Sequence, residues 1–303
     1  MNKVRKSVIS IEHVYKDYGN GRGNFDLTLD LKEGETLGLV GENGAGKTTL
    51  LRQVMGFIKS DSGKIRIYNM DAYKDSSHTK PYISYIPGEI NFPDLRSGKE
   101  LINEYAKNLD AKSENLAYAD EVIKRMQLDV RAYPKRMSKG MKQKTSIVLA
   151  FMLQNPIMIM DEPTTGLDPL MRDEFLKLVE EQKERHASMI MTSNTIEELE
   201  RVCDRVALIA KGHIIDIASV KDIDDRYFRD YKIEFNNSDE YLSFLKGRDD
   251  LVRVQPQYNQ ATIRISKEEV PDLLNELSRY DLKFISEVKY TLREYFNEIR
   301  KTK

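Results

Sequence analysis

The sequence has little cysteine and no excess of either charge, and both facts exclude classes of protein. Cys203 is the single cysteine in 303 residues, so an internal disulfide and a cysteine-based zinc site are excluded. Lysine and arginine total 48 against 49 aspartate and glutamate residues, which gives a formal net charge of −1. No global positive field therefore argues for a nucleic-acid partner, and we expect none.

Long hydrophobic runs are also missing. The longest uninterrupted apolar runs cover residues 147–153 (IVLAFML) and 156–160 (PIMIM), well below the roughly 20 residues that a membrane-spanning helix requires. The basic N-terminal stretch MNKVRKSVISIEH has no apolar core of the length found in signal peptides. We therefore expect a cytosolic protein. If it serves a membrane, another polypeptide crosses that membrane.

What the sequence does contain, over about its first 220 residues, is a regular alternation of apolar runs and helical patterns. Strands buried on both faces are predicted at TLGLV (36–40), ISYI (83–86), IMIM (157–160), SMIMT (188–192) and VALIA (206–210). Helical faces are formed by Leu101, Tyr105 and Leu109, and by Met171, Phe175 and Leu178. This alternation predicts an α/β fold whose mostly parallel sheet binds ligands beyond the carboxyl ends of its strands.

The pattern changes close to residue 222. The segment KDIDDRYFRD (221–230) is highly charged and is interpreted as a junction. After it, the apolar patterns predict the order strand, helix, two strands, helix, strand, helix, close to a split βαβ arrangement. We therefore predict a nucleotide-binding domain over 1–222 and a small α+β accessory domain over 223–303.

The segment GENGAGKT (41–48) is the motif that decides the class. It fits G-x-x-x-x-G-K-[ST], and it lies between a predicted strand and a predicted helix. Glycines let backbone N–H groups turn toward phosphates, while Lys47 neutralises them and the Thr48 hydroxyl can bind Mg²⁺. A glycine-rich turn without a ligand is the alternative, and it leaves the flanking strand and helix unexplained. We predict nucleotide contacts from Gly41, Glu42, Asn43, Gly44, Ala45, Gly46, Lys47, Thr48 and Thr49.

Two further segments supply the rest of a hydrolytic site. In IMIMDEPTTGLDP (157–169), Asp161 ends a buried strand, where it can hold the Mg²⁺ shell, and Glu162 can polarise the attacking water. The alternative is that both acids only cap the next helix. In MSKGMKQKTSIVLAF (137–151), the Ser138 hydroxyl and the Gly140 N–H lie at a helix start, where they can contact a phosphate.

The order of these motifs resembles the ATP-binding cassette (ABC) ATPases over essentially the first 220 residues. MSKGM stands in the place of that family's LSGGQ signature, and residues 166–168 in that of its D-loop. Tyr18 falls where the family stacks an aromatic ring on adenine, with Tyr15 as a rival. The resemblance implies a P-loop NTPase fold with antiparallel and helical subdomains. It also implies a dimer in which two ATP molecules are held head to tail, each between one chain's cradle and its partner's signature helix.

Three departures from the family pattern bear on activity. Gly88 and Glu89 follow the strand ISYI where the family has a glutamine, so Glu89 or a water must take that residue's place at Mg²⁺. Lys139 and Met141 replace a glycine and a glutamine of the signature, which we expect to be tolerated. Asn194 occupies the position of the switch histidine. Its amide donates a hydrogen bond but carries no proton charge, so a catalytic Asn194 predicts slow turnover; alternatively it is a helix N-cap.

The subgroup that this chain most resembles is the ABC-2 type exporter ATPases, which drive drug, antibiotic or peptide efflux. The resemblance implies a transmembrane permease on a separate chain and a place on the cytoplasmic face of the cell membrane. It also implies a second ATPase subunit, identical or different. The segment after Glu89 is then expected to form the groove for a cytoplasmic coupling helix, or else it is an ordinary amphipathic surface helix.

Two other functions remain open from the sequence. A soluble ABC ATPase that acts on ribosomes or DNA is one, although such members carry two cassettes, coiled coils or zinc modules, which this chain lacks. A nucleotide-gated regulatory or immunity subunit with weak hydrolysis is the other, and Gly88 and Asn194 motivate it.

Overall fold

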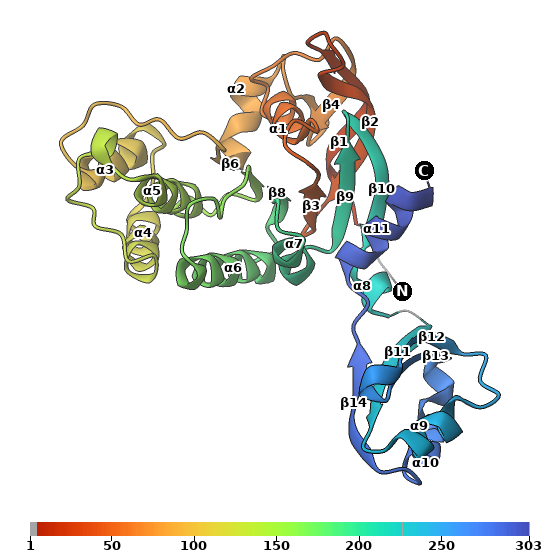
Figure 1. The fold of residues 1–303 in the computed structure, drawn as a ribbon. Coiled ribbons are helices and arrows are strands. Elements are labelled where there is room, and N and C mark those ends of the chain that lie inside the picture. The colour runs from red at the N-terminus through yellow and green to blue at the C-terminus, as the bar shows by residue number, and fades with distance from the viewer. Residues whose placement is uncertain (1–4, 226, 303) are drawn as a thin grey trace. The chain divides into compact units, whose positions relative to one another are not determined.

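The computed structural model describes residues 5–225 and 227–302. Its chain divides into two compact units, Met1–Ser219 and Val220–Lys303, where the sequence placed the division at residue 222. Each unit is built around sheets of its own (Figure 1).

A six-stranded sheet forms the centre of the first unit, in the order β10-β9-β3-β8-β7-β6. The strands are β3 (Thr36–Val40), β6 (Ile83–Ile86), β7 (Ile157–Met160), β8 (Ser188–Thr192), β9 (Arg205–Ala210) and β10 (His213–Ser219). All pair in parallel except β10, which is antiparallel to β9. Each of the five strands predicted from a continuous apolar run is therefore found, because burial on both faces demands such runs.

A second, antiparallel sheet covers one side of this core in the order β2-β1-β4-β5. Its strands are β1 (Ser7–Asp17), β2 (Gly23–Lys32), β4 (Ser62–Ile67) and β5 (Met70–Asp71). Leu27, Leu29 and Leu31 alternate with polar residues along β2 and join the same hydrophobic cluster as Leu37 and Leu39 of the central sheet. The two sheets therefore share one core.

Helices complete the first unit, and Figure 1 shows α3, α4 and α5 gathered at the side of β6. They are α1 (Lys47–Val54), α2 (Ser76–Thr79), α3 (Gly98–Asn108), α4 (Ser113–Arg125), α5 (Lys139–Phe151), α6 (Pro169–Glu184) and α7 (Ile196–Val202). The predicted face of α6 is buried at Met171, Phe175 and Leu178. On α3 the prediction was wrong for Leu109, which lies one residue past the helix end and is 46% exposed.

The second unit carries the four-stranded antiparallel sheet β12-β13-β11-β14. Its elements are α8 (Val220–Asp224), β11 (Phe228–Phe235), α9 (Ser238–Leu245), β12 (Leu251–Gln255), β13 (Gln260–Ser266), α10 (Val270–Leu277), β14 (Leu282–Val288) and α11 (Leu292–Thr302). The predicted order of strands and helices is observed, and the additional elements in the described residues are the short helix α8 in the charged junction and two 3₁₀ turns, Pro256–Tyr258 and Lys267–Glu269. Across 5–225 and 227–302, no helix combines the length and apolarity needed to cross a bilayer.

Candidate active site

The glycine-rich loop between β3 and α1 forms the base of the site because its glycines fit where no side chain does. A Cβ on Gly41 would lie 2.2 Å from the carbonyl oxygen of Ile209. Gly46 has φ 110°, and a Cβ there would lie 2.2 Å from Oδ1 of Asn24. The loop backbone can therefore pack closely against its neighbours, as a phosphate-binding loop requires, although the Ala45 N–H is used within the loop, where it donates to the carbonyl oxygen of Glu42 at 3.0 Å.

Lys47 opens α1 and is held in place inside this loop. Its Nζ donates to the carbonyl oxygens of Gly41 at 2.6 Å and Glu42 at 3.2 Å, and to Oδ1 of Asn194 at 3.3 Å. Burial lowers the pKa of Lys47, while the nearby carboxylates act against this shift. An anionic ligand binds strongly to a partly desolvated ammonium whose hydrogen bonds are accepted only by neutral groups.

A pocket of about 590 Å³ opens above the loop. Tyr18, 52% exposed, stands at this pocket, whereas its rival Tyr15 does not line it. Arg22 and Gly23 also line the pocket and were missed from the sequence, although the turn that contains them directly follows Tyr18. The lining residues are Tyr18, Arg22, Gly23, Asn43, Gly44, Ala45, Gly46, Lys47, Thr48, Thr49 and Glu162.

Asp161 lies at the carboxyl end of β7, where its carboxylate is 1% exposed. The Thr192 hydroxyl donates to Oδ1 at 2.8 Å, while Oδ2 is buried and has no hydrogen-bond partner in the described part of the chain. Burial raises the pKa of Asp161, and the hydrogen bond from Thr192 opposes the shift. A buried carboxylate oxygen without a hydrogen-bond partner, close to a threonine hydroxyl, matches the oxygen ligands that Mg²⁺ prefers.

Glu162 and Asn194, from two different loops, meet at the open side of the pocket. Asn194 Nδ2 donates to Glu162 Oε1 at 3.0 Å, so one amide bridges the carboxylate and the ammonium of Lys47. The backbone of Glu162 has φ 48°, a strained conformation for a non-glycine residue, and its N–H donates to the Thr192 hydroxyl at 2.8 Å. Asn194 is not the N-cap of α7, because that position belongs to Thr195.

The loop after β6 places Gly88 close to the buried carboxylate of Asp161. A Cβ on Gly88 would lie 3.1 Å from Oδ2 of Asp161. Glu89 does not line the nucleotide pocket and instead borders two others, one of them the groove described below. The placement therefore gives no support to Glu89 as the Mg²⁺ ligand.

Ser138 and Gly140 lie at the start of α5, away from this pocket. The Ser138 side chain accepts a hydrogen bond from the Met141 N–H at 3.2 Å and caps the helix. A Cβ on Gly140 would lie 2.7 Å from the carbonyl oxygen of Gly166. The signature turn therefore packs on the loop before α6. It does not face the pocket above the glycine-rich loop of its own chain.

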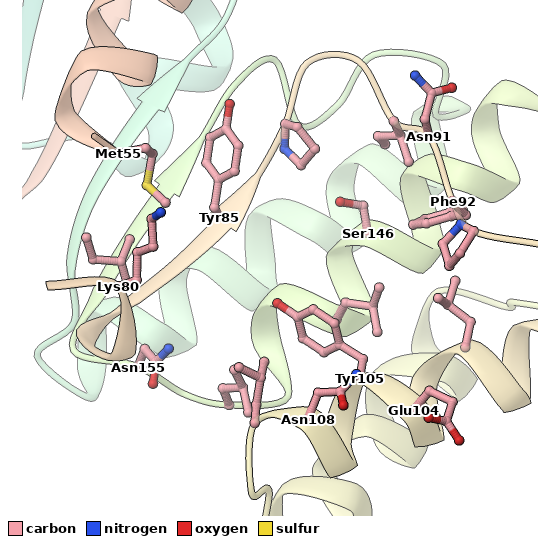
Figure 2. Close-up of a pocket in the computed structure, with 18 of the residues that line it drawn as sticks. Met55, Lys80, Tyr85, Asn91, Phe92, Glu104, Tyr105, Asn108, Ser146 and Asn155 are labelled. Carbon is pink, nitrogen blue, oxygen red and sulfur yellow. The ribbon is translucent and has the colours of Figure 1, made fainter. Parts of the chain in front are cut away.

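A groove of about 960 Å³ is lined by residues of β6, α3 and α5 (Figure 2). Tyr85 lies on the side of the sheet, while Tyr105 and Ser146 project from α3 and α5. The lining combines apolar residues such as Phe92 with charged residues such as Glu104. An apolar floor with polar edges suits the docking of an amphipathic helix.

Comparison with known proteins gives the site its family. The family model described as ABC transporter matches residues 25–165. The uncharacterized ABC transporter ATP-binding protein YhcH of Bacillus subtilis (strain 168) is 30% identical over 290 residues, which cover 94% of this chain and 92% of that protein. This chain belongs to the ATP-binding proteins of ABC transporters.

Two further similarities agree with this membership of the ABC family. The linearmycin resistance ATP-binding protein LnrL of Bacillus subtilis (strain 168) is 33% identical over 241 residues, 78% of each chain. A dimeric ATP-binding cassette solved with ADP and Pi matches the fold with a TM-score of 0.62 at 20% identity, over 70% of this chain and 98% of that one. The predicted fold class, a P-loop NTPase of ABC type, is confirmed.

Proposed function

We propose that this ABC protein binds and hydrolyses ATP to power an exporter through a separate transmembrane subunit. One observation carries the proposal. Gly88 lies so close to Asp161 that a Cβ there would be 3.1 Å from the carboxylate, and its neighbour Glu89 lines the groove. Two consecutive residues thus join the phosphate end of the nucleotide pocket to the surface that suits a partner helix. A change at the phosphate is therefore transmitted to the groove without a long relay.

The residues of the pocket divide the work of hydrolysis among them. Lys47 and N–H groups of the glycine-rich loop would hold the phosphates, and Thr48 and Asp161 would hold Mg²⁺, which would neutralise phosphate charge when bound. Glu162 accepts a proton from the attacking water, and Asn194 hydrogen-bonds the γ-phosphate. Asn194 accepts a hydrogen bond from Lys47 and donates one N–H to Glu162, so the second N–H of its amide remains as the donor for the γ-phosphate.

A second cassette completes the site in this proposal. Ser138 and Gly140 carry the donors that the sequence assigns to phosphate, yet they lie away from the pocket of their own chain. Two cassettes arranged head to tail bring each signature turn to the other's ATP, whether the second subunit is identical or different. ATP then closes the pair and hydrolysis opens it.

The groove is the proposed seat of a cytoplasmic coupling helix of the permease. This places the chain on the cytoplasmic face of the cell membrane, held by its partner. The substrate class that we propose is a drug, antibiotic or peptide, and the name of the relative LnrL, a linearmycin resistance protein, supports it. Asn194 and Gly88 favour, as a second candidate, a nucleotide-gated regulatory subunit with weak hydrolysis.

Blocking the groove is expected to uncouple the partner from an intact nucleotide site. Asn108 is exposed and lines the groove, so Asn108→Arg fills it without disturbing the core. We expect at least about a tenfold loss of co-purification with the membrane subunit encoded beside this chain, the effect of a misplaced charge in an interface. Affinity for ATP should stay unchanged.

The matched control is Asn103→Arg, which places the same charge on the exposed side of α3 outside the groove. Equal retention of the membrane subunit by both variants would contradict the coupling role of the groove. Recovery of ribosomes in place of a membrane protein would favour the soluble alternative.

Restoring a histidine is expected to speed turnover in a pH-dependent way. In Asn194→His, an imidazolium with an ordinary pKa near 6.5 replaces a neutral amide. A charge-assisted hydrogen bond is about twice as strong as a neutral one, so kcat should rise by roughly 5- to 30-fold. Because the imidazole is protonated at low pH, the ratio of variant to wild-type kcat should increase from pH 8 to pH 6. A ratio below one at every pH would exclude a γ-phosphate role for position 194.

A further inference from the structure

Behind the catalytic residues lies a buried carboxylate that neither the sequence motifs nor the proposed chemistry uses. Glu198, on α7, is 4% exposed. Its Oε2 accepts hydrogen bonds from the hydroxyls of Thr164 and Ser193, each at 2.8 Å. Nε of Arg172 lies 3.2 Å from Oε1, an ion pair without the alignment of a hydrogen bond. One carboxylate therefore joins three segments of the chain.

Two of those segments carry the catalytic residues. Thr164 lies two residues after Glu162, in the loop that continues to the start of α6. Ser193 directly precedes Asn194, and its Oγ also accepts a hydrogen bond from the N–H of Thr195 at 2.9 Å. The Glu198 carboxylate thus fixes the loop after β7 against the loop after β8.

The contact between the catalytic side chains Asn194 and Glu162 is less secure. The bond from Asn194 to Glu162 is exposed, so water competes with it. The hydrogen bonds to Glu198 are buried, where charge-assisted bonds are strong and water does not replace them. When the front contact opens, the buried one still sets the spacing of the two loops.

We infer that Glu198 is a positioning residue for ATP hydrolysis, which holds the loop of Glu162 and the loop of Asn194 in register from behind. It does not line the pocket above the glycine-rich loop. It acts through its hydrogen bonds with Thr164 and Ser193. Its ion pair with Arg172 also connects it to the first turn of α6. The inference rests on the proposed hydrolysis, and its test includes a measurement that needs no turnover.

The test compares Glu198→Gln with Glu197→Gln, which removes the same charge from an exposed position of the same helix. In Glu198→Gln we expect kcat to fall about tenfold, the effect of weakening charge-assisted hydrogen bonds. The Kd for ATP should stay within about twofold, because the cradle is untouched. Glu197→Gln should match the wild type in both quantities.

Hydrogen exchange provides the turnover-free measurement. In Glu198→Gln, amide protection should fall in residues 164–168 and in residues 193–195 together, although the change lies on α7. Thr164→Val and Ser193→Ala each remove one donor and should lower kcat without adding to the loss in Glu198→Gln. These two variants decide the matter if the Glu198 variant does not fold.

Wild-type kcat and wild-type exchange in Glu198→Gln would overturn the inference. A parallel loss of kcat, ATP affinity and thermal stability would overturn it too, because that describes a general structural role. An absence of hydrolysis in the wild type would count against the proposed function alone, since the exchange measurement still decides the role of Glu198.

Discussion

Replacing Lys47 with alanine is expected to abolish tight ATP binding. The ammonium is buried, and the oxygens that accept its hydrogen bonds belong to two carbonyl groups and one amide, which are neutral. An anionic ligand would therefore bind it strongly. Removing one member of a buried charge pair costs about 2–5 kcal/mol, which is a loss of affinity of roughly 30- to several-thousand-fold. Titration calorimetry with ATP under non-hydrolysing conditions measures the change.

The control for this prediction is Lys64→Ala, which removes an exposed lysine from β4, outside the pocket. Thermal stability should not fall in Lys47→Ala, since burial already lowers the pKa of this ammonium and its removal relieves desolvation. Unchanged ATP affinity, together with unchanged work through the membrane subunit, would contradict the whole account of the site.

Glu162→Gln is expected to stop turnover while nucleotide still binds. The substituted amide keeps a carbonyl oxygen that can accept the Asn194 hydrogen bond, so the local geometry survives. What is lost is proton acceptance from water, which contributes about 10²–10⁴ in rate. Phosphate release should fall by that factor, and ATP should hold two cassettes together as a lasting dimer.

This variant also separates the two candidate functions. Asp161→Asn serves as the comparison, because it weakens the metal position and should reduce ATP-dependent dimerisation as well as rate. If Glu162→Gln hydrolyses ATP as fast as the wild type, the regulatory function with weak hydrolysis is favoured over a transport motor.

The sequence predicted those features that local patterns determine. The five parallel strands are continuous apolar runs, and burial on both faces produces such runs whatever the surrounding fold. The cradle at 41–48 is equally local, because strand, glycine turn and helix are consecutive. Asn194 was placed at a strand tip for the same reason, and it meets Glu162 there.

What the sequence did not reveal depends on contacts between distant segments. Arg22 reaches the pocket only because the turn between β1 and β2 folds over the cradle. Glu198 looks like one more acid in the charged helix IEELERV, and its burial depends on a hydroxyl 34 residues away. The helix-face argument was wrong for Leu109 because α3 ends one residue too early for periodicity to apply. Long-range packing leaves little trace in a short window of sequence.

The contact between Gly140 and Gly166 has a consequence for how a pair of cassettes works. Main-chain atoms meet there with no room for even a methyl group, so the start of α5 cannot slide past the loop before α6. In a dimer assembled as proposed, α5 reaches toward the neighbour's ATP, and the same loop begins beside its own chain's Glu162. In that dimer, binding of ATP by one cassette would move the partner's α5 together with the loop that begins beside the partner's Glu162. The two ATP sites would therefore be coupled.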